Sequence, residues 1–457
     1  MKNILSIAFT LITVVAFGQR SNPTVDSLKN ETDPIKVKIK LAALGAGNEN
    51  DMATVVQYYA STNQAPKGDS VIYSAAAKFP HGRYALLVAM SNFSHETDPE
   101  KMEKLFVALQ QNFPDKAGSN EFNQAHNLMA VAFAEAKNTP KALEHLQQIK
   151  GRSNPMSVAR AFLAYDLTAA ENLAKPEIER LKPTPNNTYY NYVILYSKIL
   201  AKKGDKVEGL KYAQEAYDYF PKTTINEAVK NYAYLLSLNG RYIEALPLLT
   251  EIVSQGKSDD DLTAQLRTAY KSTNPDKDVN AFLSSIKSKL LEKVSADLSK
   301  KMLNEPSPDF IVTDAKGKKV SLANFKGKTI VLDFWATWCG PCKASFPAMQ
   351  LAVNHYKNDP DVQFLFIHTW ERSATPLTDA KSYLAANHYT LPLYMDVADA
   401  KTKSNPAITA FKVAGIPSKF IIDGKGNIRF QLTGFTSGQD EANATELEAM
   451  IELTRKK

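Results

Sequence analysis

The chain has 457 residues, 44% hydrophobic and 23% charged, with a formal net charge of +7. This length favours two or more domains, and the composition is that of an ordinary globular protein rather than a disordered or fibrous one. The basic charge is spread through lysine-rich segments without an arginine cluster among aromatic residues. A solvated basic surface therefore explains it better than a nucleic-acid-binding site.

Residues 1–18 have the pattern of a signal peptide. Lys2 supplies a short positive region, residues 4–17 are almost all apolar, and Ala16 and Gly18 are small residues at the two positions that a signal peptidase reads. The apolar stretch is short for a membrane span, which needs about 20 residues. We expect cleavage before Gln19 and export to a periplasm, with no stable membrane insertion afterwards. An N-terminal anchor that is never cleaved is the alternative.

Residues 19–50 are polar and poorly patterned, and the sequence predicts a linker or an irregular start there. Residues 51–302 instead show apolar residues at three- and four-residue spacing, interrupted by short turns, which indicates helices throughout. Small and apolar residues recur at helical spacing in several units, among them Met102, Phe106 and Leu109; Ala142, Leu146 and Ile149; Gly209, Ala213 and Ala216; Ala245, Leu249 and Ile252.

This helical pattern resembles a degenerate tetratricopeptide array. Gly209 and Ala245 occupy the same place in consecutive units and are 245 − 209 = 36 residues apart, close to one repeat period. A stack of helical hairpins without true repeats is the alternative. In both cases each hairpin leaves an apolar face that a neighbour must bury, and stacking gives a solenoid whose surface binds peptides or proteins.

The pattern changes after Pro306 and Pro308, which cannot continue a helix. Strands and helices alternate in residues 303–457, and this predicts an α/β domain with a mixed sheet covered by helices. The expected strands are 309–313, 319–322, 329–335, 362–368, 418–422 and 428–432, and the expected helices are 340–356, 379–387, 399–413 and 441–455.

Cys339 and Cys342 are the only two cysteines of the chain. Two thiols separated by two residues can close a reversible disulfide, so this pair is a candidate redox centre. Structural zinc takes four ligands, and no second pair of Cys or His residues has matching spacing. We therefore expect no metal and no cofactor other than the Cys339–Cys342 disulfide.

The cysteines lie in a segment, residues 333–343, that looks like the active-site segment of thioredoxins. Ile416 and Pro417 look like the cis-proline loop of the same fold, and the hairpin at 309–322 is similar to that of the TlpA/ResA type of exported disulfide reductase. The stretch 371–395 is also similar to that type. The resemblance covers 303–457, about a third of the chain. It implies a thioredoxin-like fold behind the helical repeats.

The resemblance also implies roles. Cys339, at a helix N-terminus, is favoured as a thiolate and attacks a substrate disulfide; Cys342 then attacks Cys339 and releases the reduced substrate. Asp333 is expected to lie buried beneath the pair and to accept the Cys342 proton. The alternative for Asp333 is a hydrogen-bonded polar residue near a strand end.

Substrate binding is expected at five residues: Trp338, Gly340, Pro341, Ile416 and Pro417. Plain packing is the alternative for Trp338, and a trans turn the alternative for Pro417. Many TlpA/ResA-type proteins carry a glutamate three residues after the second cysteine, where this chain has Ser345. A glutamate-based mechanism is therefore not carried over. His368 ends a strand at the same edge as the cysteines and is a candidate to approach the sulfurs.

The leading hypothesis is an exported thiol-disulfide oxidoreductase that reduces disulfides in periplasmic proteins, with the helical repeats recruiting the client. A chain with two cysteines holds no internal relay, so a separate thiol donor, expected to be a membrane thiol transporter, must reduce Cys339–Cys342. The alternatives are a disulfide isomerase or oxidase, or a protein-binding scaffold whose redox domain is secondary.

Overall fold

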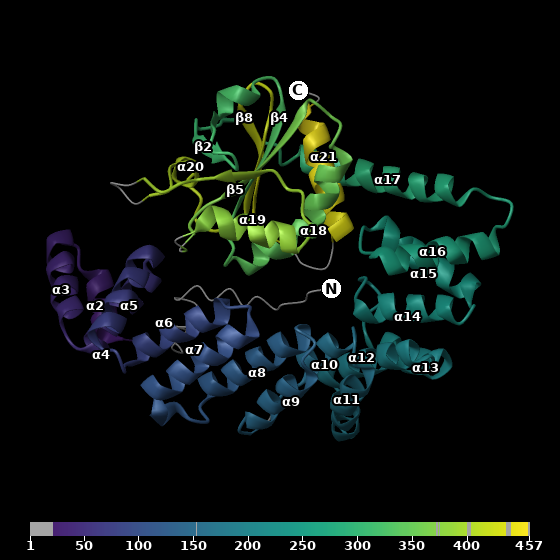
Figure 1. The fold of residues 1–457 in the computed structure, drawn as a ribbon, viewed down its shortest axis with the longest axis horizontal. Coiled ribbons are helices and arrows are strands. Elements are labelled where there is room, and N and C mark those ends of the chain that lie inside the picture. The colour runs from purple at the N-terminus through teal and green to yellow at the C-terminus, as the bar shows by residue number, and fades with distance from the viewer. Residues whose placement is uncertain are drawn as a thin grey trace. The chain divides into compact units, whose positions relative to one another are not determined.

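The structure, a computed structural model, describes residues 22–455 except 152, 372, 374, 400–403 and 436–439. The predicted signal peptide therefore lies outside the described residues. The described residues separate into two compact units, residues 22–177 and residues 178–455. Figure 1 shows the helical region and the sheet, and the order of elements agrees with the predicted all-helical part followed by an α/β domain.

The first unit consists of helices in its described part. The sequence prediction of an irregular start over residues 19–50 is wrong, because helices α2 and α3 form there. The side chains of Asn22 and Asp33 accept backbone N–H bonds at the two helix starts, and Pro23 and Pro34 follow them. A capping side chain followed by proline is a start signal that does not depend on apolar periodicity. The helices are α2 (Pro23–Asn30), α3 (Pro34–Ala46), α4 (Glu49–Ser61), α5 (Ala65–Lys78), α6 (Arg83–His95), α7 (Pro99–Asn112), η1 (Pro114–Lys116), α8 (Asn120–Glu135), α9 (Thr139–Gln148), α10 (Met156–Phe162) and α11 (Leu167–Leu181).

The second unit begins with six more helices before the sheet. Consecutive helices pack as hairpins, α12 with α13 and α14 with α15. Gly204 ends α12 in the left-handed conformation, with φ of 99°, which glycine adopts without a Cβ penalty. These helices are α12 (Asn187–Lys203), α13 (Lys206–Tyr219), α14 (Glu227–Leu238), α15 (Tyr242–Ser254), α16 (Asp260–Thr273) and α17 (Val279–Ser299).

The residues that suggested repeats lie in the contacts between paired helices. Ala213, Ala216, Ala245 and Leu249 are fully buried. At Gly209 an added Cβ would lie 2.9 Å from the carbonyl oxygen of Ser197 in α12, so α13 approaches α12 more closely than any larger residue permits. The burial fits hairpin packing, and the tetratricopeptide identity stays a prediction.

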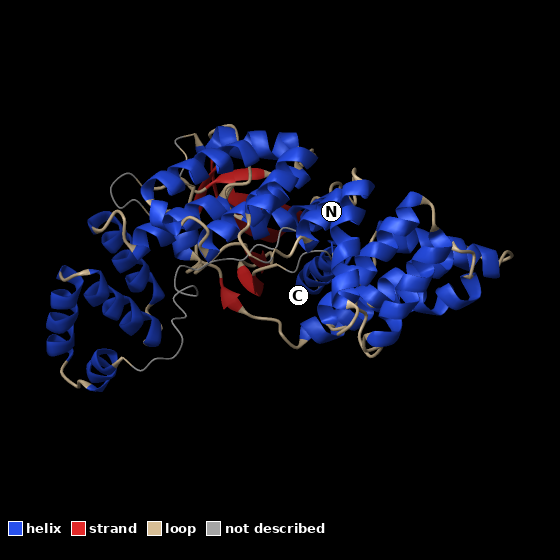
Figure 2. Cartoon of the chain, turned by 90° about the horizontal axis from the view of Figure 1, so that it is seen from below, coloured by secondary structure: helices blue, strands red, loops and turns tan. Residues whose placement is uncertain are grey.

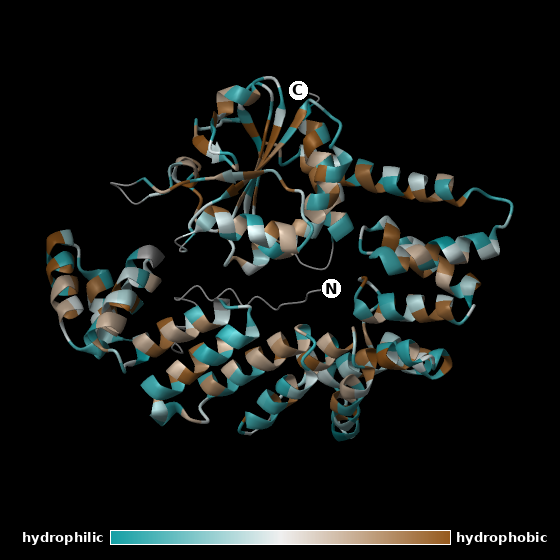
Figure 3. Cartoon of the chain, in the orientation of Figure 1, coloured by the Kyte–Doolittle hydropathy of each residue, from teal (hydrophilic) through white to brown (hydrophobic). Residues whose placement is uncertain are grey.

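An eight-stranded sheet in the order β1-β8-β7-β4-β5-β6-β2-β3 forms the C-terminal part of the second unit. Figure 2 shows its strands among helices, and Figure 3 shows that the central strands are mainly hydrophobic. The strands are β1 (Glu305–Pro306), β2 (Ile311–Asp314), β3 (Lys319–Ser321), β4 (Thr329–Trp335), β5 (Val362–His368), β6 (Leu393–Met395), β7 (Ser418–Ile422) and β8 (Asn427–Thr433).

Helices cover both faces of this sheet, and strand β4 contributes to both layers. Val331 and Trp335 pack in the cluster that holds residues of α18 and α21, whereas Leu332 and Phe334 pack in the cluster that holds α20. Successive side chains of a strand point to opposite faces, so Asp333 faces the layer of α18. The remaining elements are η2 (Leu322–Phe325), α18 (Gly340–His355), α19 (Pro376–Ala386), α20 (Pro406–Ala410) and α21 (Asp440–Arg455).

The predicted helix over 399–413 is wrong in extent, because the described part contains only the five residues of α20. Pro406 is the first residue of α20, and a proline inside a longer helix would remove a hydrogen bond and clash with the preceding turn. Lys412, with φ of 52°, follows the end of the helix. The short strand β6, which pairs in parallel with β5, was not predicted.

Candidate active site

The two cysteines form a disulfide where strand β4 turns into helix α18. Cys339 is the N-cap residue of α18, and its Sγ accepts the backbone N–H of Cys342 at 3.2 Å. The disulfide joins Cα atoms 5.3 Å apart. Cys339 is 3% exposed and Cys342 is fully buried, so Cys339 is the outer cysteine of the pair.

The position of Cys339 explains its chemistry in the reduced state. The first N–H groups of a helix have no partner within the helix, and they carry the positive end of the helix dipole. An N-cap sulfur that already accepts one of these N–H groups is stabilised as a thiolate once the disulfide opens. The thiolate is the form that attacks disulfides.

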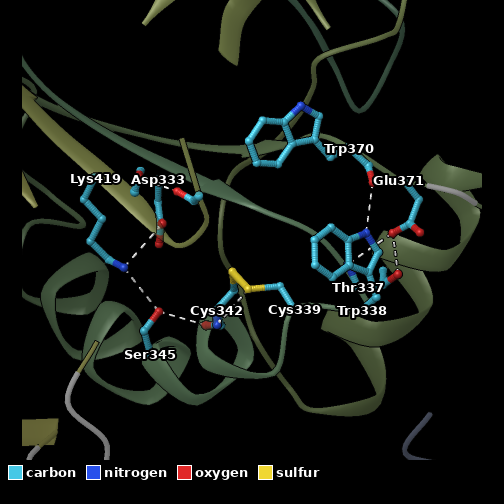
Figure 4. Close-up of a disulfide and its surroundings, with 11 residues drawn as sticks. Asp333, Thr337, Trp338, Cys339, Cys342, Ser345, Trp370, Glu371 and Lys419 are labelled. Carbon is cyan, nitrogen blue, oxygen red and sulfur yellow. Dashed lines mark hydrogen bonds and ion pairs between the residues drawn. A yellow bond between two sulfur atoms is a disulfide. The ribbon is translucent and has the colours of Figure 1, made fainter. Parts of the chain in front are cut away.

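Asp333 lies on the face of β4 that α18 covers, and it forms an ion pair with a buried lysine. Asp333 Oδ1 is 3.4 Å from Lys419 Nζ, and Asp333 and Lys419 are direct partners in the antiparallel ladder between β4 and β7. Lys419 Nζ also donates to Ser345 Oγ at 3.4 Å, and Ser345 Oγ donates to the carbonyl oxygen of Cys342 at 2.8 Å. Figure 4 shows Asp333, Lys419 and Ser345 on one side of the disulfide.

The protonation of Asp333 is set by two opposing causes. Burial raises the pKa of its carboxyl group, because a charged carboxylate loses its hydration, and the ammonium group of Lys419 opposes that rise. Neither carboxylate oxygen has a hydrogen bond among the described residues, so the ion pair is the main interaction of this group. A buried carboxyl group with a raised pKa is suited to take up a proton from a neighbouring thiol.

The other side of the disulfide is held by the loop after strand β5. The indole N–H of Trp338 donates to the carbonyl oxygen of Trp370 at 2.9 Å. The Glu371 carboxylate accepts the backbone N–H of Thr337 at 3.1 Å and also bonds to the Thr337 hydroxyl. Both residues immediately before Cys339 are therefore bonded to this loop, as Figure 4 shows.

His368 is buried at the end of β5 and lies against this loop. Its Nε2 atom is 3.1 Å from Glu371 Oε2, and its ring meets that of Trp335 edge-on with centroids 4.8 Å apart. The sequence left open whether His368 approaches the sulfurs. The structure gives it Glu371 as a partner, and the neighbouring Trp335 is fully buried.

The Ile416–Pro417 peptide bond is cis, as the sequence predicts. Pro417 is buried just before β7, and its carbonyl oxygen accepts the N–H of Gly434. Ile416 is partly buried and packs against both hydrophobic clusters of the domain. Gly340 and Pro341 form the first turn of α18. Substrate contact by these residues and by Trp338 stays a prediction.

Three residues of the site had no role in the sequence prediction: Lys419, Glu371 and Thr337. Lys419 is two residues after Pro417 and directly before the apolar run Phe420–Ile422 of a fully buried strand, and a lysine in such a strand is a signal for a buried partner. Glu371 and Thr337 are 34 positions apart and come together only through the loop conformation. Over the described residues no group of three or more His, Cys, Asp or Glu side chains is arranged to hold a metal ion.

The C-terminal domain is similar to known proteins. The AhpC/TSA family matches residues 303–431. A protein named thiol-disulfide oxidoreductase ResA from Bacillus thuringiensis is 33% identical over 141 residues, which cover 30% of this chain and 74% of the relative. Another of the same name from Geobacillus kaustophilus is 29% identical, covering 29% of this chain and 71% of the relative. A thioredoxin-family thiol:disulfide interchange protein from Chlorobium tepidum has a solved structure that is 26% identical with a TM-score of 0.27, covering 33% of this chain and 97% of that one.

The fold, the disulfide at the start of α18 and the two relatives named ResA define an enzyme with a thioredoxin-like domain, a thiol-disulfide oxidoreductase. The chain belongs to the ResA family of thiol-disulfide oxidoreductases, which its C-terminal domain matches. None of the helices in the described residues is both long enough and apolar enough to span a membrane.

Proposed function

We propose that this protein is exported and reduces disulfides in periplasmic client proteins. The observation that carries the proposal is Cys339 at the N-cap of α18 with Cys342 one turn inside the helix, on the face that also holds the buried Asp333. The dipeptide between the cysteines, Gly340-Pro341, is that of thioredoxin, whose potential of about −270 mV makes it a reductant, against about −120 mV for a strong oxidant.

The reaction has two exchange steps. The Cys339 thiolate attacks one sulfur of the client disulfide, forms a mixed disulfide and releases the other client sulfur as a thiolate. Cys342 loses its proton to Asp333, its thiolate attacks Cys339 Sγ, and the second client thiolate leaves. Two electrons pass to the client, and Cys339–Cys342 ends oxidised. A second dithiol protein, proposed to be a membrane thiol transporter, restores the dithiol because the chain has two cysteines only.

The reduction potential of the Cys339–Cys342 disulfide tests whether the protein acts as a reductant or as an oxidant. Equilibration of the full chain with glutathione or dithiothreitol buffers should give a value near that of thioredoxin, about −270 mV. A value above about −150 mV would instead favour an oxidase or an isomerase.

Clients are identified by trapping. Cys342→Ala lacks the resolving thiol, so mixed disulfides through Cys339 should accumulate in cells and release their partners on reduction. The double variant with Cys339→Ala should trap nothing. An empty trap in the single variant would contradict client reduction.

We also propose that the helical region positions the client. Two of its exposed apolar residues support this: Val207 is 66% exposed near the start of α13 and Ile243 is 83% exposed near the start of α15. They are 243 − 207 = 36 residues apart, the spacing of Gly209 and Ala245. Exposed apolar residues at equivalent places in neighbouring hairpins suit a protein-binding surface.

The recruitment proposal is tested in the trapping variant of the full chain. Replacing both Val207 and Ile243 by Glu should lower the yield of trapped clients severalfold, while reaction with a small disulfide stays unchanged. Ile311→Glu, at a residue 58% exposed in β2, is the matched control. An unchanged client yield would mean that this surface does not recruit them, and would favour recognition by the redox domain alone.

A further inference from the structure

Lys419 is a buried cation next to the redox centre. It is 6% exposed and follows Pro417 by two residues in β7. Removing an ammonium group from water is costly unless a partner of opposite charge and hydrogen-bond acceptors replace the water. Lys419 has both, the Asp333 carboxylate and the Ser345 hydroxyl, each at 3.4 Å.

The strand register fixes this arrangement. In the ladder between β4 and β7, Asp333 pairs with Lys419, Val331 with Ile421 and Leu332 with Phe420. Side chains of direct partners lie on the same face of a sheet, and that face of β4 and β7 is covered by α18 and α21. The ammonium group therefore reaches a carboxylate on β4 and the first turns of α18 from the neighbouring strand.

Ser345 connects Lys419 to the inner cysteine, Cys342, through two hydrogen bonds. Ser345 is one turn after Cys342 and donates to its carbonyl oxygen at 2.8 Å, while Lys419 donates to the same hydroxyl. The buried carboxylate that α21 contributes, Glu448, pairs instead with Lys287 and His355. Lys419, Asp333 and the Cys342 thiol are thus three charged or titratable groups on this side of the disulfide.

We propose that Lys419 is a positioning residue for the second exchange step: it keeps the Asp333 carboxylate ionised and in place to accept the Cys342 proton. The inference rests on the two-step exchange of the proposed function. In that step the S–H bond of Cys342 breaks and its proton moves to Asp333. A bond forms between Cys342 and Cys339 sulfurs as the bond from Cys339 to the client sulfur breaks. Lys419 supplies charge and takes no proton.

The reaction of the reduced full chain with 5,5′-dithiobis(2-nitrobenzoate) separates the two steps. The first thionitrobenzoate is released when Cys339 attacks, and the second when Cys342 resolves the mixed disulfide. In Lys419→Met we expect the first release to change less than twofold and the second to slow severalfold at pH 7, because an Asp333 carboxylate without a nearby cation is less readily ionised. The pH at which the second release is half-maximal should move upward, because Asp333 loses its counter-ion.

Three variants show whether Lys419 acts through Asp333. Lys419→Arg keeps the charge and should restore most of the second-release rate. Asp333→Asn should slow the second release at least as much as Lys419→Met, and combining the two should add no further loss. Lys316→Met, at an exposed turn beyond β2, is the matched control and should match the wild type.

A second release that stays within twofold of wild type in Lys419→Met would overturn the proposal, as would additive effects of Lys419→Met and Asp333→Asn. If Lys419→Met does not fold, Ser345→Ala serves instead. It removes one partner of Lys419 and should slow only the second release, about two- to fivefold; an unchanged rate would overturn the proposal. Because the probe is a small disulfide, this result is independent of whether the cell uses the protein as a reductant.

Discussion

The indole N–H of Trp338, the residue before the outer cysteine, donates to the carbonyl oxygen of Trp370 at 2.9 Å. Trp370 has φ of 50°, in the left-handed region that bulky residues rarely adopt. Such a conformation costs about 1–3 kcal/mol and persists only where surrounding contacts fix it. The bonds of Trp338 and Glu371 are contacts of this kind, so the loop after β5 and the segment before Cys339 hold each other in place.

Trp338→Phe should therefore lower the free energy of unfolding. The change keeps an aromatic ring but removes the donor, and loss of one such bond costs about 1 kcal/mol. Urea denaturation of the oxidised protein measures it. Tyr73→Phe, at a residue 44% exposed, is the control and should change stability by less than about 0.5 kcal/mol. Equal stability of Trp338→Phe and wild type would show that the bond does not hold the loop.

Asp396→Ala should be more damaging. The carboxylate is 3% exposed and accepts bonds from the Thr369 hydroxyl at 2.9 Å and from the backbone N–H groups of Ala407 and Ile408 at 2.9 and 3.0 Å. Removing it leaves buried donors without a partner, and we expect a loss of about 3 kcal/mol. Asp361→Asn, at an exposed position, is the control. Equal denaturation midpoints for Asp396→Ala and Asp361→Asn would show that the three hydrogen bonds of Asp396 do not stabilise the fold.

Gly209→Ala should disrupt the α12–α13 hairpin. The added methyl would sit 2.9 Å from the Ser197 carbonyl oxygen, so the helices must move apart, at a cost of about 1–3 kcal/mol. Gly45→Ala, inside α3 with no atom near the new methyl, should instead be neutral or stabilising by up to about 1 kcal/mol. The melting temperatures of the two variants test this. A decrease in Gly45→Ala as large as that in Gly209→Ala would show that the close approach at Gly209 is not the cause.

Acid should destabilise the protein partly through His126. Burial, with a smaller contribution from nearby His145, lowers the pKa of His126 from 6.5 to about 4. The unfolded chain then binds a proton that the native state does not between about pH 6.5 and pH 4, so stability falls as the pH decreases through this window. Because the ring is partly exposed, we expect about 1–2 kcal/mol.

His126→Phe should reduce that pH dependence. His145, whose pKa burial also lowers, keeps part of it, while Glu103 opposes the shift at His145. Unfolding free energies of both proteins at pH 7 and pH 4.5 provide the test. If the unfolding free energy of the variant fell between pH 7 and pH 4.5 as much as that of the wild type, His126 would not contribute to the acid destabilisation.

Sequence patterns within one short segment predicted the centre of the site. The contacts of Lys419 and Glu371 depend instead on segments that are far apart in the sequence. The cysteines, the start of α18 and the buried Asp333 follow from one short segment, in which strand, turn and helix succeed each other. Lys419 joins Asp333 only because of the β4–β7 register, and a one-residue shift would place it on the opposite face. Glu371 reaches Thr337 through a loop with a left-handed residue, which apolar periodicity does not indicate. The starts of α2 and α3 were missed for a different reason, since capping residues and proline define them.

The Cys339–Cys342 disulfide uses every sulfhydryl group of the chain. A thiol titration of the denatured protein therefore reads its oxidation state directly, with two thiols for the reduced form and none for the oxidised form. Any covalent adduct on a non-reducing gel must pass through this one pair, whether it joins the chain to another protein or to a second copy of itself. A disulfide-linked dimer would thus be a form in which the redox centres of both chains are open, and its abundance would report loss of exchange capacity.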